Sequence, residues 1–127
     1  MPEPRVRLTR LELEIMDRLW TLSEASVRDV LEAIPTESRP AYTTVQTILS
    51  RLEEKGAIRR VRKVGKAIVF APAITRQSIY KRLIDELLDL FGGNARPMVS
   101  HLVESGKLTL RDVREIEARA RKEGKQK

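Results

Sequence analysis

The segment AYTTVQTILSRLEEKG, residues 41–56, constrains the fold of this chain more than any other part of the sequence. Its apolar residues recur at positions i, i+3, i+4 and i+7, a spacing that gathers them on one stripe of an α-helix. These residues are Val45, Ile48, Leu49 and Leu52. We expect Thr43 to cap the start of this helix and Gly56 to follow its end. The helix is therefore amphipathic and must bury its stripe against other elements.

The other sides of this helix carry short polar side chains and one arginine: Thr43, Thr44, Thr47, Ser50 and Arg51. Threonine loses rotamer freedom in a helix and gains nothing there from packing, so an ordinary solvated face favours Glu, Lys and Gln. Short hydroxyls beside an arginine suit the edges of bases in the DNA major groove and the neighbouring phosphates. Taken alone, the stretch fits a DNA-reading helix and a merely exposed, threonine-rich helix equally well.

Two helices are expected before this segment, of which the second is short. Thr9 and Glu12 form a capping box, and Leu11, Ile15, Leu19 and Leu22 make the apolar stripe of the first helix, which Met16 and Trp20 widen. Ser26 and Asp29 cap a second helix that ends at Pro35 and turns Val27, Val30, Leu31 and Ile34 inward. A short helix, a polar turn and an amphipathic helix follow the order of a helix-turn-helix unit.

Two β-prone runs, Ile58–Val64 and Ala67–Ala71, are separated by Gly65-Lys66 and predict a hairpin. In the second run, Ile68 and Phe70 alternate with Ala67, Val69 and Ala71, as in a half-buried strand. The stretch from Lys55 to Lys66 contains six cations and no acid: Lys55, Arg59, Arg60, Arg62, Lys63 and Lys66. Such a run can be a plain solvated face, but its position after the amphipathic helix favours the wing of a winged helix.

The chain changes character at Thr75, and we expect residues 1–74 and 75–127 to form separate domains. The second should contain three helices, of which the first keeps helical apolar spacing up to Gly92-Gly93 and the second ends at Gly106. Three helices in so few residues bury too little apolar surface to stand alone, which favours a two-fold dimer over folding back on the first domain. The expected dimer residues are Tyr80, Leu83, Ile84, Leu87, Leu88, Phe91, Met98, Leu102, Val113 and Ile116. Residues 119–127 should be a basic, frayed tail.

Composition narrows the class of function. The formal net charge of +7 favours a polyanionic partner, either nucleic acid or an anionic membrane surface. The absence of cysteine excludes disulfides, thiolate metal sites and cysteine nucleophiles. We find no glycine-rich phosphate loop, ligand cluster or nucleophile–base pair, so neither catalysis nor a cofactor or metal is expected. No apolar span or signal peptide is visible, and we expect a cytoplasmic protein without membrane insertion.

Several motifs together resemble the BlaI/MecI/CopY family of bacterial repressors, which includes the penicillinase repressors. They are LTRLELEIMDRLW, TTVQTILSRLEEKGAI, KVGKAIVFAP, LLDLFGG and LVESGKLTLRDVREIE, between Leu8 and Ala118. The resemblance implies an N-terminal winged helix and C-terminal helices that form the dimer. Antibiotic-responsive members are cut at an Asn-Phe bond by a membrane-bound sensor protease, and the matching place here is His101-Leu102.

We therefore predict a mainly α fold with a small β-hairpin wing, an N-terminal winged helix-turn-helix and a C-terminal three-helix dimerisation region. The expected function is a dimeric repressor on a pseudo-palindromic operator in double-stranded DNA. The helix residues named above would approach bases, while Arg62, Lys63 and Lys66 would hold the DNA backbone or minor groove. The alternative is a winged-helix module that binds protein and does not recognise DNA.

Overall fold

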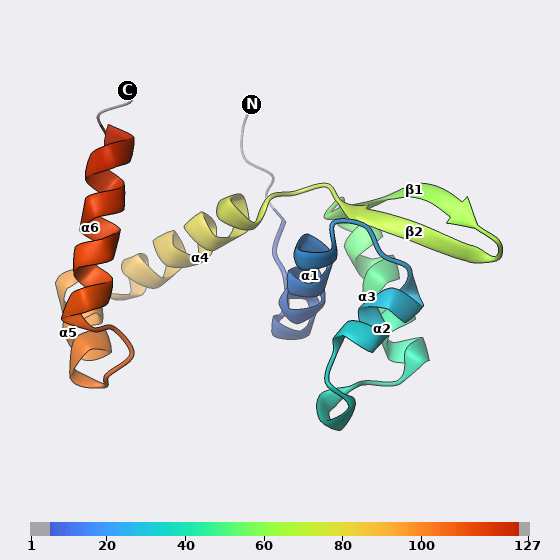
Figure 1. The fold of residues 1–127 in the computed structure, drawn as a ribbon, viewed down its shortest axis with the longest axis horizontal. Helices are drawn as coiled ribbons and strands as arrows, with labels where there is room; N and C mark the ends of the chain where they lie inside the picture. The colour runs from blue at the N-terminus through green and yellow to red at the C-terminus, as the bar shows by residue number, and fades with distance from the viewer. Residues whose placement is uncertain (1–5, 125–127) are drawn as a thin grey trace. The chain divides into compact units, whose positions relative to one another are not determined.

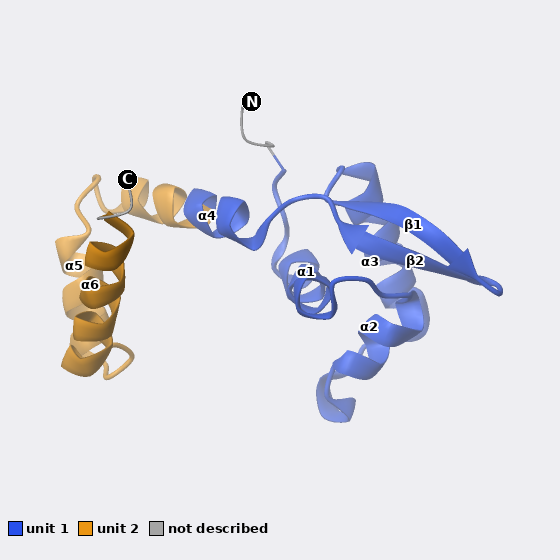
Figure 2. Ribbon diagram, turned by 45° about the horizontal axis from the view of Figure 1, so that its top comes forward, with its two compact units in different colours: residues 1–82 blue, residues 83–127 orange. Residues whose placement is uncertain are grey.

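The computed structural model describes residues 6–124 and shows a mainly helical chain with one small β-hairpin, as the sequence predicts (Figure 1). The elements are α1 (Arg10–Leu22), α2 (Val27–Ala33), the 3₁₀ turn η1 (Thr36–Ser38), α3 (Tyr42–Glu54), β1 (Ile58–Val64), β2 (Ala67–Pro72), α4 (Arg76–Leu90), α5 (Arg96–Glu104) and α6 (Leu110–Gly124). They form two compact units, Met1–Arg82 and Leu83–Lys127, which Figure 2 distinguishes by colour.

Helix α1 begins with the predicted capping box. The Glu12 amide donates to Thr9 Oγ1 at 3.2 Å, and the Thr9 amide donates to Glu12 Oε1 at 2.8 Å. The predicted apolar stripe is only half right, because Leu11 and Leu22 are 43% and 40% exposed. The buried face is instead made of Ile15, Met16 and Leu19 together with Glu12. The buried face of α1 therefore includes one carboxylate, and the two end leucines lie outside it.

Helix α2 also begins with its predicted capping box, in which Ser26 and Asp29 bond reciprocally. Helix α3 starts earlier than expected: its N-cap is Ala41, so the prediction that Thr43 caps the helix is wrong. Ala41 follows a proline and is extended (φ −66°, ψ 152°), and its carbonyl accepts the amides of Thr44 and Val45. Thr43 thus lies inside the first helical turn, with its side chain exposed.

The end of α3 shows why a glycine stands at position 56. Gly56 adopts φ +78°, a left-handed conformation that costs a residue with a Cβ more than it costs glycine. Its amide donates to the Glu53 carbonyl at 3.0 Å, and the Ala57 amide donates to the Leu52 carbonyl at 2.9 Å. This is the Schellman arrangement. It ends the helix sharply and leads the chain directly into β1.

The core of the first unit lies between α1, α2, α3 and the hairpin. The predicted stripe of α3, Val45, Ile48, Leu49 and Leu52, is buried in it. Strands β1 and β2 pair antiparallel with an irregularity between Arg60 and Arg62, and Ala25 forms a bridge to Phe70. The predicted alternation in β2 is wrong, since the consecutive residues Val69, Phe70 and Ala71 are all buried. Helices α1 and α2 both contact this strand. Together they cover more of its surface than is covered in a half-buried strand.

The first turns of α4 belong to the first unit. Ile79 is buried in its core, and Trp20 Nε1 donates to the Ile74 carbonyl at 3.0 Å. The Arg76 guanidinium lies over the Trp20 ring, 5.4 Å from its centroid, and pairs with Asp17 at 3.2 Å. These contacts explain why the compact unit continues to Arg82 and does not stop at the residue 74 boundary expected from the sequence.

In the second unit, the remainder of α4 is followed by α5 and α6. Helix α5 ends in a second Schellman arrangement at Gly106, as predicted. Helix α6 starts with a Thr109–Asp112 capping box, in which the amide and hydroxyl of Thr109 hold the pKa of the Asp112 carboxyl below its usual value. The frayed tail expected after residue 118 is wrong for residues 119–124, which continue α6, whereas residues 125–127 lie outside the described part.

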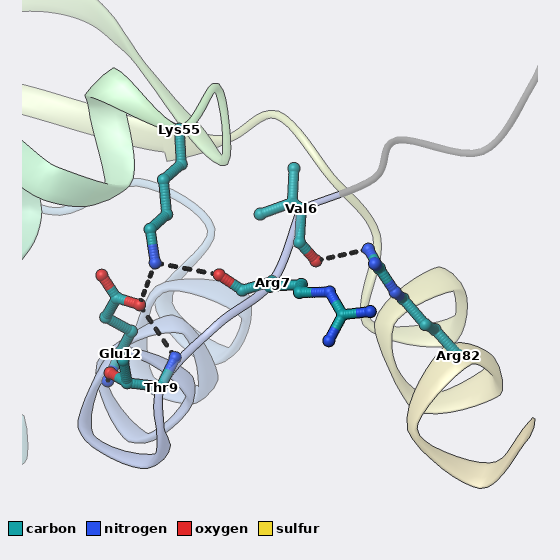
Figure 3. A network of polar contacts seen from close by, with 6 residues as sticks. All are labelled: Val6, Arg7, Thr9, Glu12, Lys55 and Arg82. Carbon is teal, nitrogen blue, oxygen red and sulfur yellow. Dashed lines mark hydrogen bonds and ion pairs between the residues drawn. The ribbon is translucent and has the colours of Figure 1, made fainter. Parts of the chain in front are cut away.

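An ion pair between a buried carboxylate and an exposed lysine joins distant parts of the first unit (Figure 3). Glu12 is 3% exposed, and its carboxylate accepts from Lys55 Nζ at 2.5 Å. The same ammonium donates to the Arg7 carbonyl at 2.9 Å. Burial raises the pKa of Glu12, but the hydrogen bonds from Lys55 and Thr9 outweigh it, so the pKa lies below its ordinary 4.5. The pair ties the end of α3 to the start of α1 and to the N-terminal segment.

This pair makes stability depend on pH. A carboxylate whose pKa is depressed by folding stabilises the fold above its unfolded pKa, and this contribution is lost as the pH falls through the folded value. We expect Glu12→Gln to lower the free energy of unfolding at pH 7 by about 1–3 kcal/mol and to flatten its decline in acid. Urea unfolding between pH 7 and 3 measures both effects.

The matched control is Glu14→Gln on the same helix. Glu14 forms an exposed i,i+4 pair with Arg10 at 3.7 Å, which should contribute little. Equal losses from the two substitutions would show that the Glu12 pair acts as an ordinary surface pair.

Candidate nucleic-acid interface

The face of α3 turned away from the core is polar and exposed. The structure leaves all the predicted residues of this face accessible: Thr43, Thr44, Thr47, Ser50 and Arg51. The Thr47 hydroxyl donates to the Thr43 carbonyl at 2.9 Å, which fixes its rotamer and leaves its oxygen free to accept. No partner is recorded for the Arg51 guanidinium within residues 6–124. The face therefore offers short acceptors and donors beside one free cation.

Three of the six cations in the stretch 55–66 are neutralised within the protein. Lys55 pairs with Glu12, and Arg60 forms a two-point contact with Glu53 at 2.7 and 3.2 Å. The Glu53 carboxylate raises the pKa of Arg60, whose guanidinium also lies over the Phe70 ring at 5.9 Å. Arg62, predicted to hold DNA, forms an ion pair with Glu24 in this structure.

The other three, Arg59, Lys63 and Lys66, have exposed side chains. None of them has an acidic partner in the described part of the chain. The hairpin thus presents fewer free charges than its sequence suggests, because two acids from other elements, Glu24 and Glu53, reach two of its arginines.

Two polar residues beside this face are not among those predicted from the sequence. Arg28, on α2, and Tyr42, on the first turn of α3, line a groove between α2, α3 and the hairpin, together with Ser50 and Lys66. Arg28 could have been noticed because it lies away from the inward residues of α2, but only the fold brings it close to Lys66.

No group of three or more potential metal ligands occurs among residues 6–124, and no helix in that range is long and apolar enough to cross a membrane.

Comparison with known proteins identifies the family. A family model described as "Penicillinase repressor" matches residues 8–122. The chain belongs to the penicillinase repressor family. It is a winged-helix transcriptional repressor, in agreement with the resemblance noted from its motifs.

Individual relatives agree with this assignment. The repressor is 35% identical over 101 residues to "Transcriptional regulator BlaI" of Mycobacterium tuberculosis, covering 77% of this chain and 72% of the relative. It is 27% identical over 111 residues to the "Penicillinase repressor" of Bacillus licheniformis, covering 87% and 86%. The solved DNA-binding domain of the repressor BlaI matches with a TM-score of 0.52 and 28% identity, over 61% of this chain and 93% of that domain.

The C-terminal residues predicted for a dimer fall into two groups. Tyr80 lies in the first unit, where its ring meets Trp20 edge-on with centroids 6.2 Å apart. The others lie in the second unit, and none of them is fully buried: Leu83, Ile84, Leu87, Leu88, Phe91, Met98, Leu102, Val113 and Ile116. The repressor thus leaves a series of large apolar side chains accessible to solvent in its second unit.

The His101-Leu102 bond lies within α5. The His101 carbonyl accepts the Ser105 amide at 2.9 Å, and the Leu102 carbonyl accepts the amides of Lys107 and Leu108 at 2.9 and 3.0 Å. Both side chains are exposed, but the peptide bond is held in a helix and in its C-terminal cap. A protease that binds an extended segment needs α5 to unwind locally before it reaches this bond.

The Arg62–Glu24 pair leads to a prediction for the repressor. A neutral residue at position 24 frees the Arg62 guanidinium for phosphate. We expect Glu24→Gln to steepen the dependence of DNA affinity on salt by about one unit. Fluorescence anisotropy on random duplex DNA at several salt concentrations measures this slope.

Glu54→Gln is the matched control, since Glu54 is exposed on α3, has no cationic partner in the described range, and changes the net charge equally. Identical salt slopes for Glu24→Gln and the unaltered protein would show that Arg62 forms no new contact with a DNA phosphate when its ion pair with Glu24 is removed.

Proposed function

We propose that the repressor works as a dimer on a pseudo-palindromic operator in double-stranded DNA, with each first unit contacting one half-site. The observation that carries this proposal is the exposed polar face of α3, Thr43 to Arg51, beside a hairpin with three unpaired cations. A helix of this kind fits the major groove, where short polar side chains reach base edges. Repression follows when the bound dimer blocks access of RNA polymerase to the promoter.

The proposed contacts divide by chemistry. Thr43, Thr44, Thr47, Ser50 and Arg51 approach bases and the phosphates beside them. Lys63 and Lys66 hold the DNA backbone or the minor groove, and Arg62 joins them only once it is released from Glu24. Contacts to bases discriminate between sequences, whereas contacts to phosphates add affinity for any sequence.

A protein-binding winged helix is the competing hypothesis. It would need the exposed face of α3, but it has no use for Arg59, Lys63 and Lys66 as unpaired cations on the adjoining hairpin. That distribution of charge favours a polyanion. The two hypotheses differ in whether affinity for DNA depends on sequence.

The second unit supplies the proposed dimer contact. Large apolar residues that remain accessible, such as Leu87 at 43% and Phe91 at 45%, are better buried against a second copy than left in water. We therefore assign DNA binding to the domain of residues 1–74 and dimerisation to residues 75–127, with the first turns of α4 packed on the DNA-binding unit.

The setting of the protein follows from this role. The family consists of transcriptional repressors, and we propose that this chain acts in the cytoplasm, where its operator lies, without catalysis of its own. Release of the operator by a membrane-bound sensor protease acting at His101-Leu102 is a further part of the proposal, and it requires local unwinding of α5.

The first test concerns sequence reading by α3. We expect Thr47→Ala and Arg51→Ala each to weaken operator binding by about 1–3 kcal/mol while changing affinity for random DNA much less, because contacts with base edges discriminate between sequences. Titration of both duplexes by anisotropy measures the difference.

Thr21→Ala is the control for Thr47→Ala, since the exposed Thr21 hydroxyl makes the same i−4 contact, to the Asp17 carbonyl at 2.9 Å, on α1. Equal losses of affinity for operator and random DNA would show that these α3 residues only position the protein on the duplex and do not read its sequence. No loss on either would favour the protein-binding hypothesis.

The second test concerns the dimer. Two half-sites held by one dimer bind as a chelate, which can raise affinity by about 10²–10⁴ without a new contact. We expect a chain truncated after Arg82 to stay folded, to be monomeric and to bind a full operator little better than one half-site. Sedimentation velocity and titrations on half-site and full-site duplexes measure these properties.

Leu87→Asp in the full chain should act in the same direction. Leu22→Asp is its control, because Leu22 is an exposed leucine of similar accessibility in the first unit. A truncated chain that still dimerises would place the interface in the first unit instead.

A further inference from the structure

Residues 6–8 form a short strap that precedes α1 and belongs to neither a helix nor a strand. Val6 and Leu8 are half-buried and pack against the core of the first unit, whereas Arg7 between them is exposed. Every second side chain thus seats the strap on the core. Neither the polar face of α3 nor the dimer contact proposed above uses this segment.

Two cations from distant parts of the chain hold the backbone of the strap (Figure 3). Lys55, which follows α3, donates from Nζ to the Arg7 carbonyl at 2.9 Å. Arg82, on α4, donates from Nη1 to the Val6 carbonyl at 2.8 Å. Hydrogen bonds from charged donors are stronger than those between neutral groups. Because the two carbonyls belong to neighbouring residues, the strap links the end of α3 to α4 through one short stretch of backbone.

The contact at Arg82 complements the anchors of α4 nearer its start. Arg76 pairs with Asp17 at 3.2 Å, and Ile79 is buried in the core. These two anchors lie within one turn of the helix, and by themselves they let it pivot. Arg82 lies six residues beyond Arg76, which is about 9 Å farther along the axis and on another side of the helix. The strap therefore fixes the direction in which α4 leaves the first unit.

That direction is carried on by α4 itself. The helix runs from Arg76 to Leu90 and contains neither proline nor glycine, so it continues past the end of the first unit. A helix without such residues bends only gently. In a dimer held by its second units, the direction of α4 then decides where each copy of α3 meets the DNA.

We propose that the strap and Arg82 position the two copies of α3 in the dimer and so restrict the distance between half-sites that the repressor accepts. Arg82 is a positioning residue and does not touch DNA in this role. The proposal rests on the proposed function, because it takes the second units as the dimer contact and α3 as the helix that reads DNA.

A series of half-site spacings tests this role in the full-length protein. The duplexes carry the footprinted half-site once, or twice at the native spacing and at spacings changed by one or two base pairs. Each base pair moves one half-site by about 3.4 Å and rotates it by about 35°. We expect the unaltered protein to bind the native spacing much more tightly than the altered ones.

Arg82→Met keeps the apolar stem of the side chain and removes its donors. It should leave half-site affinity unchanged and reduce the preference for the native spacing roughly tenfold, since a looser connection lowers the effective concentration of the second half-site contact. Loss of half-site affinity equal to the loss on the full site would show that Arg82 supports only the fold of the first unit, and would overturn the proposal.

Deletion of residues 1–7 removes the two carbonyls, which no side-chain substitution can do. It should change the spacing preference as Arg82→Met does, and the two changes combined should have no larger effect, because each removes the same link. Effects that add in the combined variant would show that Arg82 acts through a group other than the strap and would overturn the proposal.

Arg10→Met is the charge-matched control. Arg10 lies in the same unit, close to the strap in sequence, and forms an exposed pair with Glu14 at 3.7 Å. It should leave the spacing preference unchanged. A change equal to that of Arg82→Met, or an Arg82→Met profile identical to that of the unaltered protein, would overturn the proposal while leaving operator binding intact. An unaltered protein that binds the full site no better than one half-site would instead overturn the proposed dimer, and this proposal with it.

Discussion

The fold of the first unit depends on how α3 divides its surface between the core and solvent. Val45, Ile48, Leu49 and Leu52 are buried against α1, α2 and the hairpin, and this burial is the main favourable term in holding the helix. Because those four residues share one side of the helix, the polar side must point outward. The same packing that stabilises the unit therefore presents Thr47 and Arg51 to solvent.

Electrostatic contacts within the unit decide which charges remain for a partner. The buried Glu12 neutralises the charge of Lys55. The contacts of Lys55 with Glu12 and with the Arg7 carbonyl join α3 to α1 and to the N-terminal segment. Glu24 and Glu53 hold Arg62 and Arg60 at the surface. The surface pairs contribute little to stability, since exposed ion pairs are worth roughly 0–1 kcal/mol. Their larger effect is to lower the number of free cations and so the affinity for DNA of any sequence.

The two units handle apolar surface differently. The first buries most of its large apolar side chains in one core, which extends to Ile79 at the start of α4. In the second unit, none of the described residues is buried. This holds even though Thr109 and Asp112 cap the start of α6 and Gly106 follows the end of α5. Local capping fixes where these helices begin and end, but it does not bury their apolar faces. A second copy of the chain can supply the missing surface.

The sequence by itself determined the elements whose causes are local. Capping boxes at Thr9 and Ser26, the glycine after α3 and the i, i+3, i+4 stripe could all be predicted because each depends on residues a few positions apart. The polar face of α3 followed from the same periodicity. The family also followed from the resemblance of the motifs, and the family model matches residues 8–122, which include them.

Only the tertiary structure decided the features that join residues far apart in sequence. It showed that the buried Glu12 pairs with Lys55, that Arg62 pairs with Glu24, and that Arg28 lies in one groove with Lys66. It also moved the start of α3 to Ala41 and carried the first unit into α4. Periodicity in the sequence predicts which side of a helix each residue lies on, and its residue type gives its charge. A salt bridge or a groove depends in addition on which side chains from distant parts of the sequence the packing brings close together.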